Sequence, residues 1–325
     1  MKVAFFQPFL NVRGSTVALY DYAYYNEQLL SNESLVIYEK NDSRNDDTAI
    51  KRFDKNLNCI SLNSINDLSD TLVKNQCDAV YITKRGYKND PPNDGLVSGV
   101  CKTLIQALGL APESEAHGDV YAYCSYFSSN YCSDGRLPVV PYMVDLPDIN
   151  DDLRNELNIP DEAIVYGRSG GLDTFCNGGL NFPLEVIKTV LDQREDVYFV
   201  FQNTPVFHTH PRILYANFTS DIEYKTKFIN TCDAMIHFRH EGETYGMSCA
   251  EFSLRNKPVI TWYGSAERNH IETLGDKGIY FMNPQDLYNI FMNFKPDPSK
   301  DWNAYKNYSP EKIMNIFKEV YLSWR

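Results

Sequence analysis

Short apolar runs alternate with longer amphipathic stretches along the whole chain, and this alternation limits the fold more than any other feature of the sequence. An apolar run followed by a helical stretch is typical of a strand in a parallel sheet and the helix that leads to the next strand. The alternation occurs in both halves of the chain. We therefore predict an α/β protein with two doubly wound parallel-sheet domains.

The predicted elements follow the apolar runs and the helical periodicity. In the first half we expect strands over 2–7, 34–39, 58–62, 79–83, 102–107 and 119–124, and helices over 15–31, 47–56, 65–76 and 125–132. In the second half we expect strands over 163–167, 197–201, 212–216, 233–238, 258–261 and 278–281, and helices over 180–194, 222–231, 246–255, 267–274 and 284–293.

Length and local signals locate the domains. A chain of 325 residues fits two domains of about 150 residues each. We predict a first domain over 1–145, a second over 146–308 and a terminal helix over 309–325. Ser309 suits the N-cap of that helix and Pro310 its first turn. We also expect a short helix after Asn150, with Asn150 as its N-cap.

Charge and cysteine usage exclude several classes of function. The net charge of −12 at pH 7 disfavours a nucleic-acid partner, because phosphate backbones bind basic surfaces. No apolar run approaches the roughly 18 residues of a membrane span, and the first residues lack the features of a signal peptide. The eight cysteines have no metal-ligand spacing, and several lie in apolar runs, as free buried thiols do. We predict a cytoplasmic protein with no transmembrane segment and no metal site.

Two carboxylates, Glu243 and Glu251, flank a predicted helix start in the sequence E-T-Y-G-M-S-C-A-E. An apolar run precedes them, and Gly246 and Met247 open the helix. Glu243 should therefore lie on the loop and Glu251 a little over one turn into the helix. A helix N-terminus offers N–H groups and partial positive charge to an anion. A phosphate site beside two hydroxyl-binding carboxylates would suit a nucleotide sugar.

This spacing resembles the signature of glycosyltransferase family 4, whose members are retaining enzymes of the GT-B fold. Both Glu residues, the Gly and the later Pro-Val-Ile match, whereas the usual wording differs at Thr244, Tyr245, Met247 and Phe252. A second, independent match covers Val140-Pro141, Asp145, Ile159-Pro160 and residues 166–168. Together the matching stretches span 138–282, and the first domain matches in outline.

The resemblance implies a GT-B protein, with two Rossmann-like domains, a cleft between them and a terminal helix that crosses back to the first domain. It implies transfer of a sugar from a nucleotide-diphosphate sugar to a glycan, lipid or protein-linked acceptor. Glu243 would then act on the donor sugar and Glu251 would bind the ribose. His117, from the first domain, would lie beside the donor sugar as a second catalytic candidate. The chain has no strand-end D-x-D motif, so we expect no metal cofactor.

Further donor-binding candidates lie in segments that follow strands. Gly167 and Arg168 belong to a Gly-rich turn over 166–171, where small residues admit a diphosphate and an Arg can contact it with two N–H groups. Gly14 and Ser15 follow the first strand, where the family has a glycine loop. The remaining candidates are Arg239, His240, Tyr245, Gly246 and Met247.

One family residue is missing from the Gly-rich turn. The family usually has a Lys a few residues after the Arg, but residues 173–177 read Asp-Thr-Phe-Cys-Asn. Arg239, His240 or Lys188 could supply the missing charge.

Two other functions compete with transfer. A sugar-nucleotide epimerase uses the same two-domain architecture but needs further carboxylates for proton abstraction. A nucleotide-sugar or carbohydrate-binding protein without turnover would not need to retain Glu243, Gly246 and Glu251. A Rossmann dehydrogenase would need G-x-G-x-x-G after a strand, and Gly167 to Gly171 do not have that spacing.

Overall fold

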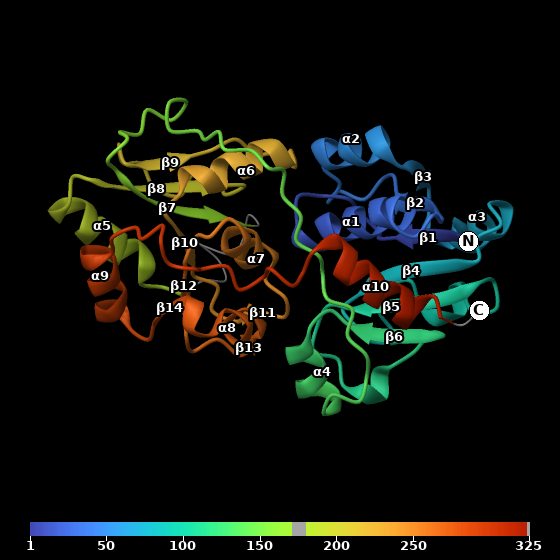
Figure 1. Ribbon diagram of the computed structural model, residues 1–325. Coiled ribbons are helices and arrows are strands. Elements are labelled where there is room, and N and C mark those ends of the chain that lie inside the picture. The colour runs from blue at the N-terminus through green and yellow to red at the C-terminus, as the bar shows by residue number, and fades with distance from the viewer. Residues whose placement is uncertain (171–179, 324–325) are drawn as a thin grey trace. The chain divides into compact units, whose positions relative to one another are not determined.

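The computed structural model describes residues 1–170 and 180–323. It divides the chain into two compact units, Met1–Met143 with Tyr308–Arg325, and Val144–Asn307. In each unit a parallel sheet lies between helices (Figure 1). Each unit therefore has its own core and its own set of strand ends.

The first unit contains a parallel sheet with the order β3-β2-β1-β4-β5-β6 among the described residues. Its strands are β1 Lys2–Phe6, β2 Glu33–Glu39, β3 Asn58–Leu62, β4 Ala79–Lys84, β5 Lys102–Ala107 and β6 Val120–Tyr123. Its α-helices are α1 Gly14–Gln28, α2 Asp47–Asn56, α3 Leu68–Lys74, α4 Tyr126–Ser133 and α10 Pro310–Tyr321, and its short 3-10 helices are η1 Ile65–Asp67, η2 Asp94–Leu96 and η3 Glu113–Glu115.

The central strands of this sheet are buried on both faces, which explains why their sequences are apolar without alternation. Successive residues still point to opposite sides. Phe6 and Ile82 pack with Leu72 of α3 on one face. On the other face, Phe5 and Tyr81 lie against rings from helices.

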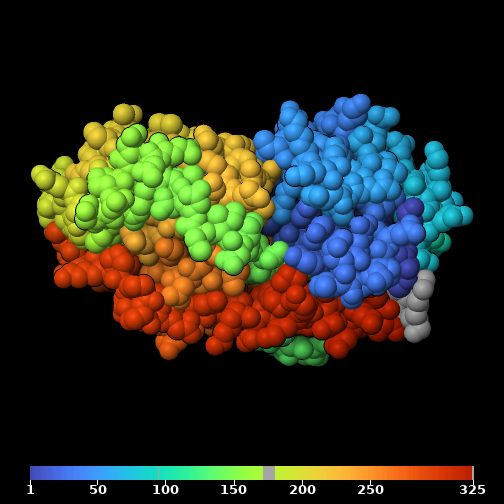
Figure 2. All heavy atoms as spheres, turned by 45° about the horizontal axis from the view of Figure 1, so that its top comes forward, coloured from blue at the N-terminus to red at the C-terminus, as the bar shows by residue number. Residues whose placement is uncertain are grey.

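Helix α10 supplies part of that second face, although it is separated from the rest of the unit in sequence. The ring of Phe317 lies 6.3 Å from Phe5, 5.1 Å from Tyr22 of α1 and 5.7 Å from Tyr81, between centroids. The hydroxyl of Tyr321 donates to the carbonyl oxygen of Ile105 at 2.9 Å. In Figure 2 the red C-terminal segment lies beside the blue N-terminal residues of this unit. The first unit thus needs residues from both ends of the chain.

The second unit repeats this topology with the strand order β14-β12-β10-β7-β8-β9 among the described residues. Its strands are β7 Ile164–Ser169, β8 Val197–Gln202, β9 Ile213–Tyr215, β10 Ala234–His237, β12 Val259–Trp262 and β14 Gly278–Phe281. Its helices are α5 Pro183–Gln193, α6 Ile222–Thr231, α7 Met247–Leu254, α8 Asn269–Leu274, η4 Gly275–Lys277 and α9 Pro284–Asn293.

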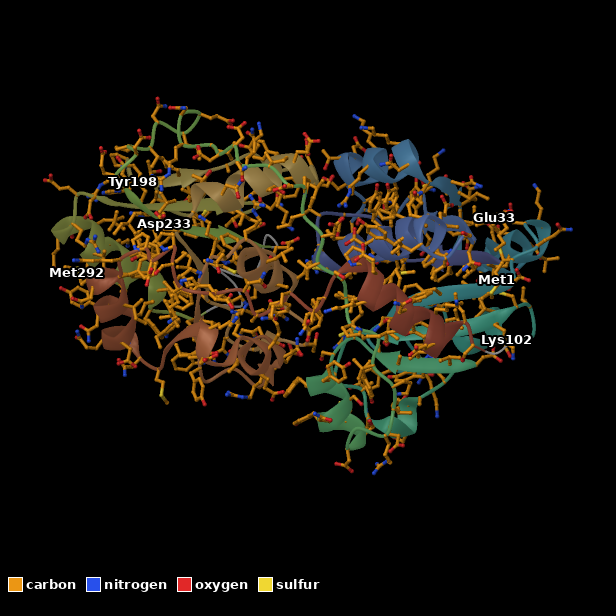
Figure 3. The ribbon with its side chains drawn as sticks, in the orientation of Figure 1. Met1, Glu33, Lys102, Tyr198, Asp233 and Met292 are labelled. Atoms are coloured by element: carbon orange, nitrogen blue, oxygen red, sulfur yellow. The ribbon has the colours of Figure 1, made fainter. Side chains whose placement is uncertain are left out.

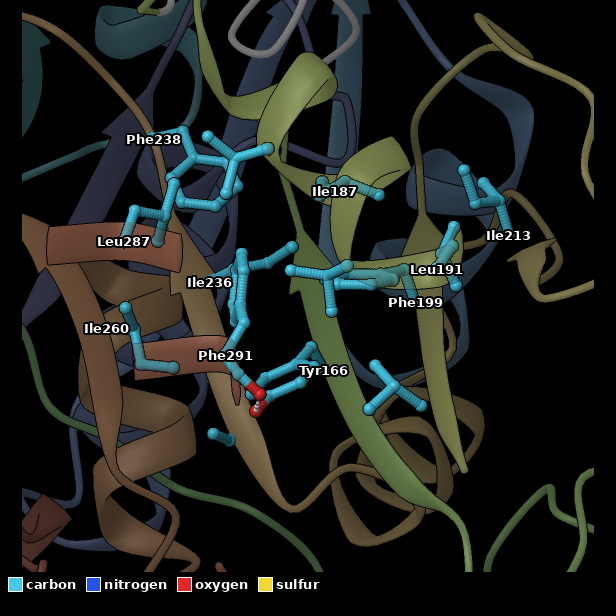
Figure 4. Close-up of a cluster of buried hydrophobic side chains, with 14 of the residues drawn as sticks. Tyr166, Ile187, Leu191, Phe199, Ile213, Ile236, Phe238, Ile260, Leu287 and Phe291 are labelled. Atoms are coloured by element: carbon cyan, nitrogen blue, oxygen red, sulfur yellow. Dashed lines mark hydrogen bonds between the residues drawn. The ribbon is translucent and has the colours of Figure 1, made fainter. Parts of the chain in front are cut away.

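The core on one face of this sheet is built from aromatic and branched side chains (Figure 4). Tyr166 and Phe199, on neighbouring strands, stack at 5.3 Å, and Phe291 of α9 packs on both. Ile187 and Leu191 of α5 cover the same face. On the opposite face Phe228 of α6 meets Phe252 of α7.

The structure differs from the sequence prediction in two places. The residues after Asn150 form turns rather than a helix, because the N–H of Leu153 donates to the side chain of Thr231 and joins this segment to α6. Two short strands were also missed, β11 Gly242–Glu243 and β13 Glu267–Arg268, which pair in parallel. The helix expected over 267–274 therefore begins later, at Asn269.

Parallel strands give each sheet an edge of strand starts and an edge of strand ends. Met1, Glu33 and Lys102, at or just before strand starts, lie at the same end of the first sheet (Figure 3). The strand ends, with the loops that follow β1 and β4, lie at the opposite edge. In the second sheet, the strands β7 and β10 end together beside each other.

The packing of α10 makes a prediction about stability. Phe317→Ala should lower the free energy of unfolding of the first unit by about 3–5 kcal/mol, because it removes a fully buried ring. Urea unfolding followed by tyrosine fluorescence and circular dichroism would measure the change. Glu319→Ala, on the exposed side of the same helix, should change it by no more than roughly 0.5 kcal/mol. Equal unfolding midpoints for both variants and the unchanged protein would contradict this packing.

Candidate functional site

In the second sheet the strand order reverses between β7 and β10, which are neighbours although other strands separate them in sequence. Ligands of open α/β sheets bind beyond the strand ends at such a reversal, because the connections leave toward opposite faces and open a crevice. Arg168 lies at the end of β7 and His237 at the end of β10. The loop after β10 carries Glu243 to this edge.

Two glycines shape the loop that carries Glu243. Gly242 has a φ of +85°, and a Cβ there would lie 2.0 Å from the carbonyl oxygen of Glu267, so β11 can approach β13 only without a side chain. Gly246 has a φ of +90° and is the N-cap of α7. A left-handed residue at this point lets the chain leave β11 and enter the helix at once.

The carboxylate of Glu243 is held by two donors. Its Oε1 lies 3.2 Å from Nε2 of His237, and its Oε2 accepts from Nη1 of Arg239 at 3.0 Å. Burial raises the pKa of this carboxyl, but the hydrogen bond from His237 and the charge of Arg239 outweigh it and lower the pKa to about 2. Glu243 is therefore an anion throughout the neutral range, and its side chain retains 25% exposure.

Glu251, on α7, is more deeply buried than Glu243, and only one of its two carboxylate oxygens has a hydrogen-bond partner among the described residues. The residue is 2% exposed, and its Oε1 lies 2.5 Å from the ammonium of Lys225 on α6. Its Oε2 is buried, and no other described residue donates to it. Buried carboxylate oxygens normally have a donor, so this oxygen is available to accept a further hydrogen bond. Lys225 was missed from the sequence because it lies in a different helix with no shared local pattern.

Arg168 is buried at the end of β7, with 3% exposure, and its Nη1 donates to the hydroxyl of Thr204 at 3.3 Å. Its guanidinium covers Gly170, where a Cβ would lie 2.7 Å from Nη1. Gly167 has another role, because a Cβ there would lie 2.1 Å from the sulfur of Cys232 on α6. Its small size thus serves the packing of strand on helix. Gly171 and the segment 173–177 lie outside the described residues.

The other candidates of the second unit differ in accessibility. Gly246 and Met247 open α7, whose N-terminus has no side-chain cap, so its N–H groups can meet an anion. Tyr245 is 3% exposed and packs against Tyr305, as a core residue does. His240 is exposed. Lys188 lies on α5, where its ammonium contacts Glu185.

In the first unit, Gly14 and Ser15 form the start of α1, and this N-terminus also has no side-chain cap. The preceding loop is fixed by Gln7, whose amide donates to the carbonyl oxygen of Phe9 and to the hydroxyl of Thr16, both at 2.9 Å. The strand order reverses here between β1 and β4. Gly14 and Ser15 thus lie at the matching place of the first sheet.

His117 is 8% exposed, and both its ring nitrogens are engaged. Nδ1 lies 2.7 Å from the carbonyl oxygen of Glu115, and Nε2 lies 2.8 Å from the ammonium of Lys84 at the end of β4. A catalytic role for His117 stays a prediction, and it requires the ring to exchange its contact with Lys84 for one with a substrate.

A polar chain behind Glu243 was also missed from the sequence. Nδ1 of His237 lies 2.9 Å from the hydroxyl of Thr261, and that hydroxyl lies 3.0 Å from Nε2 of His270. The two imidazole rings are 4.7 Å apart. Burial, and then the nearby His237, lower the pKa of His270 well below its usual value.

Within residues 1–170 and 180–323, no group of three or more His, Cys, Asp or Glu side chains is arranged to hold a metal ion. No helix in these ranges has the length and apolar character needed to cross a membrane.

Comparisons with known proteins concern the fold. No protein-family model matches the chain, and no curated protein matches its sequence. HepE of Anabaena, in a crystal structure with UDP and glucose, has a TM-score of 0.70 at 15% identity, over 99% of this chain and 100% of that one. A glycosyltransferase from Rickettsia africae has a TM-score of 0.71 at 16% identity, over 100% and 99%. A UDP-GlcNAc 2-epimerase from Neisseria meningitidis, bound to UDP-GlcNAc, has a TM-score of 0.63 at 12% identity, over 99% and 100%.

These likenesses confirm the GT-B fold class predicted from the sequence, with two parallel-sheet α/β domains. At such identities they concern the fold alone. Because this fold occurs in transferases and in epimerases, the choice between the two depends on the side chains.

The low pKa of Glu243 makes a prediction about pH. An ionised Glu243 stabilises the folded state at pH values above the usual carboxyl pKa, and this contribution is lost as the pH falls from about 4.5 toward about 2. Glu243→Gln should therefore weaken the dependence of the unfolding free energy on pH between pH 6 and pH 3. Urea unfolding across this range would measure it. Glu195→Gln, an exposed control in the same unit, should keep the dependence of the unchanged protein.

Proposed function

We propose that this protein is a retaining glycosyltransferase of the family 4 kind, which moves a sugar from a nucleotide-diphosphate sugar to a glycan, lipid or protein-linked acceptor. The observation that carries the proposal is the pair of carboxylates around the start of α7. Glu243 is a fixed, partly accessible anion, and Glu251 has a buried oxygen without a donor among the described residues. The uncapped helix start lies between them in the chain.

Each group has a role that suits its surroundings. The free oxygen of Glu251 accepts a hydrogen bond from a ribose hydroxyl, while Lys225 pairs with the other oxygen. The N–H groups of Gly246 and Met247 and the guanidinium of Arg168 bind the diphosphate. The side chain of Arg239 is already paired with Glu243 and Glu267, so it acts mainly by holding Glu243.

Glu243 acts on the sugar rather than on the nucleotide. Cleavage of the bond between C1 and the diphosphate leaves a sugar with oxocarbenium character and positive charge. A carboxylate that is already ionised and held by two donors stabilises that charge without reorganisation during the reaction. The remaining lone pairs of its carboxylate oxygens accept hydrogen bonds from hydroxyl groups of the bound donor sugar. His117 and the start of α1, from the first unit, are further candidates for contact with the sugar and acceptor.

UDP-sugars are the donors to test first. HepE of Anabaena and the epimerase of Neisseria meningitidis share the fold, and their crystal structures contain UDP or UDP-GlcNAc. A panel of donors should also include GDP-, ADP- and dTDP-sugars. Donor binding would raise the apparent melting temperature.

Sugar-nucleotide epimerisation is the second candidate, because epimerases have this fold. Proton abstraction from a sugar needs groups whose pKa lies near the working pH. Glu243, with a pKa of about 2, is a poor proton donor and a weak base at neutral pH. This favours transfer over epimerisation at the Glu243 site.

The roles of the two carboxylates can be separated by measurement. Glu251→Ala should weaken UDP binding roughly tenfold to a hundredfold, because it removes a charge-assisted hydrogen-bond acceptor. Glu243→Ala should lower kcat and leave UDP binding nearly unchanged, because its partner is the sugar. Calorimetric titration with UDP and an assay of UDP release from the donor would test both. Glu272→Ala, an exposed control on α8, should change neither.

An equal loss of UDP affinity in the Glu243 and Glu251 variants would contradict this division of roles. Conversion of the donor to its 2-epimer, without release of nucleotide diphosphate, would replace transfer by epimerisation.

We also propose that transfer needs no divalent metal. The sequence lacks a strand-end D-x-D motif, and the helix start with Arg168 offers positive charge for the diphosphate. Initial rates after dialysis against EDTA should equal those before it, and added Mn²⁺ or Mg²⁺ should not raise them. Loss of activity in EDTA that Mn²⁺ restores would contradict the proposal.

A further inference from the structure

We propose that Thr261 and His270 are positioning residues for Glu243, and that they act by supplying the hydrogen bond that Nδ1 of His237 accepts while its Nε2 donates to Glu243. The four residues form one chain of hydrogen bonds from the accessible edge of the second sheet into its interior. Three of them are buried, with 5% exposure for His237 and 0% for both Thr261 and His270. The chain joins β11, β10, β12 and α8.

The direction of the chain follows from its first member. An ionised carboxylate only accepts hydrogen bonds, so Nε2 of His237 must carry a hydrogen and donate to Oε1 of Glu243. In a neutral imidazole the other nitrogen is then an acceptor. Nδ1 of His237 therefore accepts the hydroxyl hydrogen of Thr261.

The last member of the chain agrees with this direction. Because the hydroxyl hydrogen of Thr261 is used toward His237, its oxygen accepts from Nε2 of His270. Nδ1 of His270 then carries a lone pair and no hydrogen. That atom is buried and has no hydrogen-bond partner among the described residues.

The opposite direction would be costly. If Nδ1 of His237 donated to Thr261, the hydroxyl would donate to Nε2 of His270, and Nδ1 of His270 would become a buried N–H without an acceptor among the described residues. Only the first direction avoids this. Thr261 thus accepts a hydrogen bond from His270 and donates one to His237, and His237 in turn donates to Glu243.

The assignment itself does not depend on the reaction that the protein catalyses. Nitrogen-15 spectra of the free protein, labelled at its six histidines, report the tautomer of each imidazole. The signals of His237 and His270 are identified by their loss in His237→Gln and His270→Gln. We expect each of these two rings to carry its hydrogen on Nε2 and none on Nδ1. A hydrogen on Nδ1 of His237, or on both of its nitrogens, would overturn the proposal.

Two substitutions at Thr261 test its part in the chain. Thr261→Val keeps the shape but removes the hydroxyl, so Nδ1 of His237 should lose its hydrogen bond and its nitrogen-15 signal should shift. Thr261→Ser keeps the hydroxyl and should keep the spectrum of the unchanged protein. Thr226→Val is the matched control, because Thr226 is equally buried in the same unit but its hydroxyl donates to a helix carbonyl. An unchanged His237 signal in Thr261→Val would also overturn the proposal.

The effect on turnover rests on the proposed function. With a donor that the unchanged protein turns over, Thr261→Val should lower kcat about tenfold and leave the affinity for UDP within about twofold. Thr261→Ser should restore kcat, and Thr226→Val should not lower it. Equal kcat in Thr261→Val and the unchanged protein would refute the positioning role. Absence of turnover in the unchanged protein would instead count against the proposed function, while the spectra of the free protein still decide the tautomer.

Discussion

A partly buried carboxylate is held in place by the donors that the chain supplies to it, and this constraint organises the second unit around Glu243. His237 must end β10 and Arg239 must lie two residues later, so that both reach the carboxylate. The loop must also turn so that the carboxylate of Glu243 faces these two donors, and this turn brings Gly242 against β13. The backbone of the loop, the short strand pair and the polar side chains behind them all serve to hold one anion.

The same reasoning separates the two carboxylates of the site. Glu243 is satisfied by its donors and keeps some exposure, so it is prepared to act as a fixed charge. Glu251 is more deeply buried, and one of its oxygens has no donor among the described residues. Its ion pair with Lys225 offsets part of the cost of burying the charge, and a ligand hydroxyl would supply the rest. Glu243 thus has a hydrogen-bond partner for both of its oxygens without a ligand, whereas among the described residues Glu251 has one for only one oxygen.

Much of the fold could be predicted because fully buried parallel strands are continuous apolar runs. β4, for example, is buried along its whole length, and its sequence has no polar face to obscure the signal. The prediction of a helix after Asn150 was wrong because the N–H of Leu153 donates to the hydroxyl of Thr231. These two residues are 78 positions apart, so no local sequence pattern contains the contact. The strands β11 and β13 are too short to show a period.

For the site, the sequence was informative where residues lie close together in the chain. Glu243, Gly246 and Glu251 share one segment, and the structure places them as that segment indicates. Lys225, Thr261 and His270 reach the same region from three other elements. Their roles depend on tertiary contacts, so a single sequence could not identify them. For Gly167 the sequence was misleading in the other direction. Its place in a motif suggested ligand binding, but its small size is explained by close packing against Cys232.

The division of the first unit between the two ends of the chain has a consequence for biosynthesis. Phe5, Tyr22 and Tyr81 are made early, but the ring that covers them, Phe317, leaves the ribosome only after the whole second unit. Until then the nascent first unit exposes an aromatic surface, of the kind that chaperones bind and that promotes aggregation. The second unit is continuous in sequence and can complete its core earlier. The second unit can therefore complete its core before the first, although synthesis of the first begins earlier.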